Sequence, residues 1–191
     1  MKALFTALAM STLLSACSSS PVSHFYILEA QAEPESQSAA TVAIGVGPVS
    51  TANYLDNPRI LTSPNGVELS SSPIDLWAEP LHNGITRVIT ANLVALTGNH
   101  RIRPFPWRSD EQPQLAIKVE VLELNANAGT ADLYLRWSIR HRQGSEPLAE
   151  GFSRYTEPLQ GTGYTAVSKA YSALLAQFSR HIARQLQHQA Q

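Results

Sequence analysis

The sequence predicts an α+β fold in which a mostly antiparallel sheet carries two amphipathic helices on one of its faces. In residues 115–121 and 133–139, apolar and polar side chains alternate, which is typical of strands with one buried face. In residues 79–96 and 163–186, apolar residues recur at helical spacing. Strands grouped together, rather than alternating regularly with helices, favour an α+β arrangement over a doubly wound parallel sheet.

The N-terminus has the organisation of an export signal. Lys2 is followed by a mostly apolar run over residues 3–14 and then by the small residues Ser15 and Ala16. This run is too short to cross a hydrocarbon core of about 30 Å as a helix. We therefore expect residues 1–16 to be a cleaved signal peptide, residues 17–23 to be a short tether, and residues 24–191 to form a single domain.

The residues Leu14-Ser15-Ala16-Cys17 resemble the lipobox of bacterial lipoproteins, in which the cysteine receives a diacylglycerol and the new N-terminus is acylated. Cys17 is the only cysteine, so an internal disulfide is excluded and lipid attachment at Cys17 is predicted. The alternative is a plain secretory signal with an incidental cysteine. In such lipoproteins an Asp after the cysteine often signals retention at the inner membrane. The residue here is Ser18, so the resemblance implies an outer-membrane anchor facing the periplasm.

Several shorter elements precede the first helix. Residues 25–28 and 41–49 are rich in β-branched or aromatic side chains and are predicted to be strands, with a polar loop between them. Residues 59–62 and 67–70 flank the sequence Ser63-Pro64-Asn65-Gly66, which favours a small hairpin. Gly98 is expected to end the first helix.

The second half of the chain is predicted to be two strong strands, a weaker strand over residues 148–156, and the longest helix from Gly163 onward. The charged side chains Lys118, Arg136 and Arg140 fall on the polar side of the strong strand pair, so this side is expected to face solvent. The apolar stripe of the last helix is explained by packing on the protein's own sheet, although a partner helix is an alternative.

No motif of an enzyme or of a cofactor site is present. The six histidines lack metal-ligand spacing, and no G-x-S-x-G sequence occurs. Gly45-Val46-Gly47 follows a strand, but Ser50 stands where a dinucleotide-binding fingerprint needs its third glycine. The net charge of −1 gives no general attraction to nucleic acid. We therefore predict a binding or structural module with no catalytic activity, metal or cofactor and no nucleic-acid partner.

Two further stretches carry a resemblance to a known family. The first is Val46-Gly47-Pro48-Val49 followed by Tyr54-Leu55-Asp56-Asn57-Pro58-Arg59-Ile60, and the second is Leu76-Trp77-Ala78-Glu79-Pro80-Leu81 leading into Ile85-Thr86-Arg87-Val88 and Asn92-Leu93. Together with the lipobox they resemble the ABC-type transport auxiliary lipoproteins, the PqiC/YmbA-like family. Many relatives have a sequence like Asp-Arg-Pro-Gln where this chain has Asn57-Pro58-Arg59.

The resemblance implies a non-enzymatic outer-membrane lipoprotein that works with a PqiB-like MCE-domain protein in lipid transport between the two membranes. The resemblance is also compatible with a homo-oligomer. The candidate partner-binding residues are Tyr54, Asp56, Trp77 and Pro80. Each has a structural explanation too, as a turn cap, a packed aromatic ring or a helix start. The alternative function is an envelope-assembly or stress-resistance lipoprotein that binds cell-wall or outer-membrane proteins.

Overall fold

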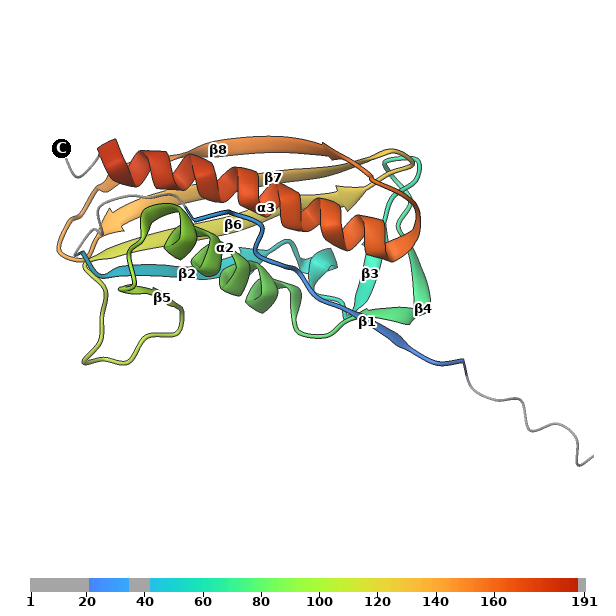
Figure 1. Ribbon diagram of the computed structural model, residues 1–191, viewed down its shortest axis with the longest axis horizontal. Coiled ribbons are helices and arrows are strands. Elements are labelled where there is room, and N and C mark those ends of the chain that lie inside the picture. The colour runs from blue at the N-terminus through green and yellow to red at the C-terminus, as the bar shows by residue number, and fades with distance from the viewer. Residues whose placement is uncertain (1–20, 35–41, 189–191) are drawn as a thin grey trace, which may run out of the picture.

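A computed structural model describes residues 21–34 and 42–188, so the predicted signal peptide and Cys17 lie outside the described residues. The elements in chain order are β1 (His24–Tyr26), β2 (Ile44–Thr51), η2 (Asn53–Leu55), β3 (Arg59–Thr62), β4 (Ser70–Trp77), α2 (Leu81–Thr97), β5 (Ile102–Pro104), β6 (Leu115–Ala126), β7 (Thr130–His141), β8 (Pro147–Pro158) and α3 (Gly163–His188). The predicted α+β class with two helices is confirmed (Figure 1).

The strands form two mixed sheets, so the expectation of a mostly antiparallel sheet is wrong. The larger sheet has the order β5-β2-β6-β7-β8, and the smaller has the order β1-β4-β3. In the larger sheet β2 runs parallel to both β5 and β6, and in the smaller β1 runs parallel to β4. The long connection from β2 through α2 to β5 supplies the crossover that a parallel pair needs. The nearly continuous burial of β2 agrees with its place between two neighbours and beneath a helix.

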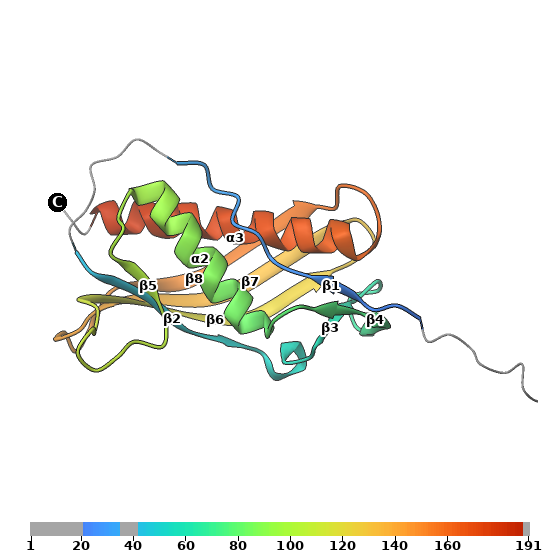
Figure 2. The same cartoon turned by 60° about the horizontal axis from the view of Figure 1, so that its bottom comes forward.

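Both helices lie on the same face of the larger sheet (Figure 2). Helix α2 packs over β2 and β5, whereas α3 packs over β7 and β8, and the two helices contact each other. The core between helices and sheet includes Val88, Leu93, Leu135, Leu174 and Phe178, all fully buried. The apolar stripe of α3 is buried in this core. Its long amphipathic pattern is therefore explained by packing on the protein's own sheet, as predicted.

The opposite face of the larger sheet is exposed and charged, as predicted. Lys118, Arg136 and Arg140 line a shallow hollow of about 260 Å³ there, together with Glu120 and Glu150. Arg136 and Glu120 lie on neighbouring strands with their charged atoms 3.8 Å apart. Because both side chains are largely exposed, this ion pair contributes little to stability.

Three local expectations are corrected. Residues 67–69 do not belong to a strand, because the side chain of Asn65 accepts hydrogen bonds from the backbone N–H groups of Val67 and Glu68 and closes a turn there. Strand β4 begins only at Ser70 and continues to Trp77, well beyond the expected strand over residues 67–70. Helix α2 begins at Leu81 rather than at residue 79 and ends at Thr97, and the left-handed backbone of Gly98 gives the predicted C-cap.

Candidate partner-binding site at the junction of the two sheets

The short helix η2 presents two of the predicted partner-binding residues to solvent. It follows directly after β2, where the Ala52 N–H donates to the Val121 carbonyl 2.9 Å away. Leu55 points into the core, while Tyr54 remains 38% exposed and Asp56 is exposed. Partial burial raises the pKa of the Tyr54 hydroxyl above its ordinary value. An aromatic ring next to a carboxylate on a fixed turn suits protein recognition.

Trp77 lies beneath this surface rather than on it. Its side chain is 8% exposed, and its indole ring stacks on the ring of Tyr171 in α3. Its backbone N–H donates to the carbonyl of Pro58, 2.7 Å away, which joins the end of β4 to the loop that follows Asp56. Trp77 is therefore a packed aromatic ring that supports the η2 loop from inside.

Pro80 is exposed and occupies the N-cap position of α2. Its carbonyl accepts hydrogen bonds from the N–H groups of Asn83 at 2.9 Å and Gly84 at 3.2 Å. Proline has no N–H to leave unpaired at a helix start, so the residue suits this position whether or not a partner contacts it. The binding roles of Tyr54, Asp56, Trp77 and Pro80 all stay predictions.

A polar cluster that the sequence analysis did not single out holds the N-terminal segment, residues 27–32, across the two helices. The Asn92 side-chain oxygen accepts from the N–H groups of Gln31 and Ala32, each 3.0 Å away, and its amide donates to Ser179. On α3, Ser168 donates to the Ile27 carbonyl and Ser172 accepts from the Glu29 N–H. Asn92 is fully buried within the apolar stripe of α2, and this polar residue on an apolar face was the available signal.

Arg87 strengthens the same attachment from the outer side of α2. Its guanidinium donates to the Leu28 carbonyl 2.9 Å away and forms an ion pair with Glu79, which precedes the helix. One side chain thus links the N-terminal segment, α2 and the end of the connection from β4. Arg87 and Asn92, which belong to the second motif, therefore both hold the N-terminal segment against α2.

Asp75 fixes β1 to β4 through a second polar cluster. Its carboxylate accepts from the Tyr26 hydroxyl at 2.8 Å and lies 3.2 Å from a ring nitrogen of His24. Hydrogen bonding from Ser72, and then from Tyr26 and His24, lowers the pKa of Asp75 below its ordinary value. No group of three or more metal-ligating side chains occurs in residues 21–34 and 42–188.

This fold and these motif positions agree with a known family. A family model described as the ABC-type transport auxiliary lipoprotein component matches residues 26–183, which run from the last residue of β1 into α3 and include α2 and the η2 loop. The chain belongs to this family. The match confirms the resemblance carried by the Tyr54 and Trp77 motifs. No curated protein sequence matches this auxiliary lipoprotein significantly.

Two solved structures share the fold of this auxiliary lipoprotein. Protein XCC0632 from Xanthomonas campestris, a member of the DUF330 family, is 16% identical, with a TM-score of 0.73 over 88% of this chain and 99% of its own. An uncharacterized protein is 20% identical, with a TM-score of 0.71 over 87% of this chain and 99% of its own. At these identities the likeness establishes the shared architecture alone.

Among the helices in the described part of the chain, none combines the length and the apolar character needed to span a bilayer. Membership of a lipoprotein family is compatible with attachment to the envelope through a lipid. Acylation of Cys17 stays a prediction.

Proposed function

We propose that this chain is a non-enzymatic, periplasm-facing lipoprotein, anchored in the outer membrane by acylated Cys17, that serves an MCE-type system for lipid transport between the two membranes. The observation that carries the proposal is the match of residues 26–183 to a transport auxiliary lipoprotein family. The lipobox at residues 14–17 and Ser18 support the anchor and its sorting.

The partner in this proposal is a PqiB-like MCE-domain protein, and its docking site is the η2 loop. Tyr54 supplies a partly exposed aromatic ring, and Asp56 supplies an exposed carboxylate two residues further along the loop. The loop is held from below by the hydrogen bond from Trp77 to Pro58 and by buried Leu55. Little conformational freedom would be lost when a partner binds, which favours affinity.

Photocross-linking in living cells tests this proposal. A photoreactive amino acid replaces Tyr54 or, in a second strain, Asp56, and a matched control carries it at Gln143, which is exposed in the turn between β7 and β8. We expect mass spectrometry to identify an MCE-domain protein from positions 54 and 56 and not from position 143. Capture of only cell-wall or outer-membrane proteins would contradict the transport role and favour the envelope-assembly function.

A pair of surface variants gives an independent test. Tyr54→Ala and Asp56→Ala should each weaken capture of the MCE-domain protein by about tenfold, because interface aromatic and charged anchors commonly contribute 1–2 kcal/mol or more. The free energy of unfolding should change little for Asp56→Ala, since this residue is exposed. Undiminished capture by both variants would place the docking site elsewhere.

A further inference from the structure

Three loops meet at the end of the molecule where β1 begins. They are residues 63–69 between β3 and β4, residues 127–129 between β6 and β7, and residues 159–162 between β8 and α3. The Ser63 N–H donates to the Ala126 carbonyl at 2.8 Å, and the Leu159 N–H donates to the Gly129 carbonyl at 2.9 Å. Figure 1 shows these connections at the upper right of the molecule, and β1 begins at the lower right of the same end.

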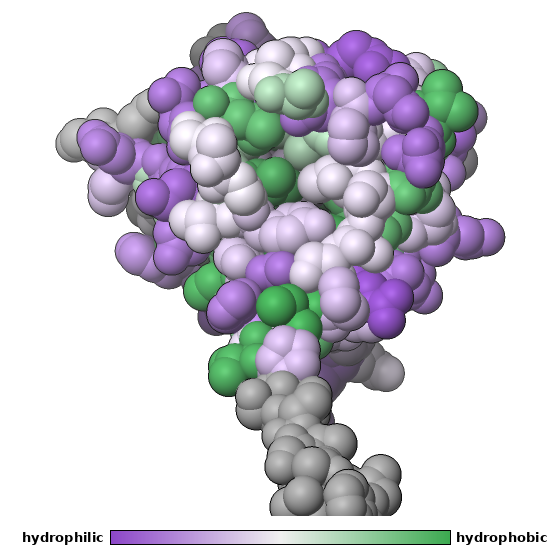
Figure 3. All heavy atoms as spheres, turned by 90° about the vertical axis from the view of Figure 1, so that its right-hand side faces the viewer, coloured by the Kyte–Doolittle hydropathy of each residue, from purple (hydrophilic) through white to green (hydrophobic). Residues whose placement is uncertain are grey.

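The three loops at this end, which we call the charge-poor end, carry little charge. Glu68 is the only charged residue in the three loops. A hollow of about 280 Å³ between them is lined by described residues that are all uncharged, among them Pro64, Asn127, Leu159 and Tyr164. Figure 3, which looks onto this end, shows side chains of intermediate hydropathy across its middle.

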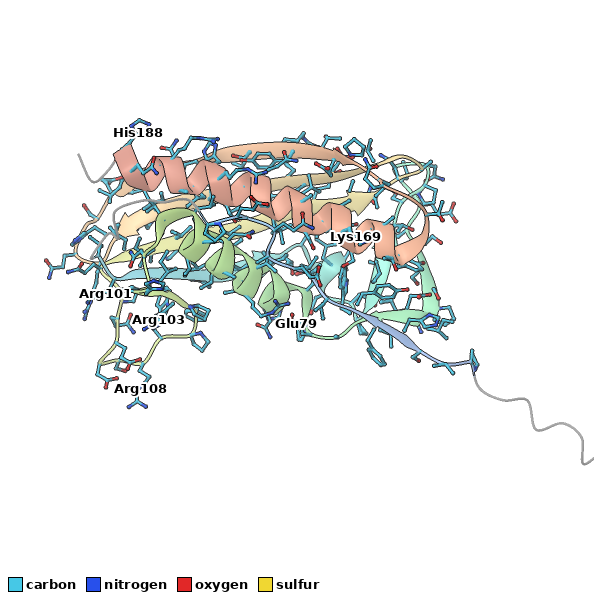
Figure 4. All side chains as sticks on the ribbon, in the orientation of Figure 1. Glu79, Arg101, Arg103, Arg108, Lys169 and His188 are labelled. Atoms are coloured by element: carbon cyan, nitrogen blue, oxygen red, sulfur yellow. The ribbon has the colours of Figure 1, made fainter. Side chains whose placement is uncertain are left out.

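The loops at the opposite end of the molecule carry more charged residues. There the loop over residues 105–114 meets the turn over residues 142–146, since the Arg142 N–H donates to the Gln114 carbonyl at 2.8 Å. These two segments carry Arg108, Asp110, Glu111, Arg142 and Glu146. Figure 4 shows Arg108 at the far end from β1. Charge is therefore distributed unequally along the long axis.

The charge-poor end exposes several apolar side chains. Val67 at the hairpin tip is 90% exposed and Leu69 is 47% exposed. Val22 and Phe25, where the described chain begins, are 78% and 66% exposed. In Figure 3 apolar residues lie beside this starting point, next to hydrophilic ones. Exposed apolar residues on a surface with little charge mark a contact with an apolar medium or partner.

The length of the chain between Cys17 and Val22 identifies that medium. Val22 lies five positions after Cys17, and five extended residues span at most about 17 Å. If Cys17 carries acyl chains in the membrane, Val22 lies within this distance of the lipid. The apolar end is thus the part of the domain that the anchor keeps nearest to the bilayer.

We infer that the charge-poor end, with Val22, Phe25, Val67 and Leu69, lies against the lipid surface of the membrane. The inference rests on the acylation of Cys17 in the proposed function, and it is independent of the MCE partner. Burial of these side chains in the headgroup region removes apolar surface from water, and only Glu68 among the loop residues has a charge to keep hydrated. The orientation directs the charged end with Arg108 away from the membrane.

Site-specific fluorescence on the acylated full-length protein tests the orientation. Cys17 is the only native cysteine and acylation consumes its thiol, so a cysteine placed at Val67 or Phe25 is the only thiol for labelling. The matched control is Arg108→Cys, at an exposed position of the opposite end. Each labelled protein is reconstituted into vesicles of phosphatidylethanolamine and phosphatidylglycerol that contain a spin-labelled phospholipid as quencher.

We expect the lipid-borne quencher to reduce the emission of probes at positions 67 and 25 at least about twofold more than at position 108, with a blue-shifted emission at the first two. Mass spectrometry of the same samples reports acylation of Cys17. An unacylated chain would overturn this inference and the proposed anchor together. An acylated chain quenched equally at positions 67 and 108 would overturn the orientation alone and leave the proposed transport function standing.

Discussion

The indole ring of Trp77 stacks on the phenol ring of Tyr171, with ring centroids 6.2 Å apart and planes inclined by 28°. Trp77 ends β4 in the smaller sheet, and Tyr171 lies on α3 above the larger one. The contact therefore joins two parts of the fold that are almost a hundred residues apart in sequence. Both side chains are buried, so the pair belongs to the core.

The first prediction concerns this aromatic pair. Trp77→Ala should lower the free energy of unfolding by about 3–5 kcal/mol, because it removes a large buried ring and leaves a cavity. Urea denaturation of the purified protein measures the change. The control Phe152→Ala removes a ring that is 61% exposed and should cost less than about 1 kcal/mol. Equal losses in the two variants would contradict the structural role of Trp77.

The second prediction concerns the attachment of the N-terminal segment. Asn92→Ala should cost about 1–3 kcal/mol, because the N–H groups of Gln31 and Ala32 lose the acceptor that they share. Hydrogen exchange at these two amides should accelerate at the same time. Asn83→Ala on the exposed side of the same helix is the matched control and should leave their exchange unchanged. Unaltered exchange in Asn92→Ala would show that other contacts hold the segment.

The third prediction concerns Gly45 in β2. A Cβ atom at this position would collide with the Trp107 ring and lie 2.6 Å from Pro113, so even alanine displaces the loop over residues 105–114. We expect Gly45→Ala to destabilise the protein by about 1–3 kcal/mol and to alter the near-ultraviolet circular dichroism of Trp107. Gly129→Ala, where a Cβ meets no atom within 4 Å, should do neither. A neutral Gly45→Ala would contradict the close packing of Trp107 on β2.

The fourth prediction concerns pH. Because the pKa of Asp75 is lowered in the folded state, the unfolded chain binds this proton more readily. The stabilisation is therefore complete above the unfolded pKa of about 4 and is lost as pH falls through the lower folded pKa. Urea denaturation between about pH 2 and 5 should show a shallower loss of stability on acidification in Asp75→Asn than in the unmodified protein. The exposed control Glu68→Gln should retain the steep loss, and an unchanged slope in Asp75→Asn would refute the assignment.

Local chemistry made several elements predictable. Alternation in residues 115–121 and 133–139 identified β6 and β7 and the exposed side of Lys118, because the side-chain period of a strand is two. Gly98 marked the end of α2, since its left-handed backbone conformation suits glycine. Parallel pairing of β2 was missed, because its direction depends on where the chain goes after Thr51 and on neighbours brought in by α2.

Among the candidate site residues, the motifs identified which positions belong together but not which of them face outward. Tyr54 and Trp77 carry similar motif signals in the sequence, yet Tyr54 is partly exposed and Trp77 is buried. The difference comes from α3, whose Tyr171 covers Trp77. Asn92 could have been suspected of a buried polar role from its place on an apolar stripe, although its partners Gln31 and Ala32 lie about 60 residues away along the chain.

The sequence by itself determined the family motifs, the predicted lipid attachment at Cys17, the class of the fold and the pattern of buried faces. These depend on residue types at short spacing, where helical and strand periodicities act. Only the tertiary structure decided the mixed sheets, the burial of Trp77, the attachment of residues 27–32 across both helices and the gathering of three charge-poor loops at one end. Each of these arises from contacts between residues distant in the chain, and their pairing is set by packing and hydrogen bonding in space rather than by local preference.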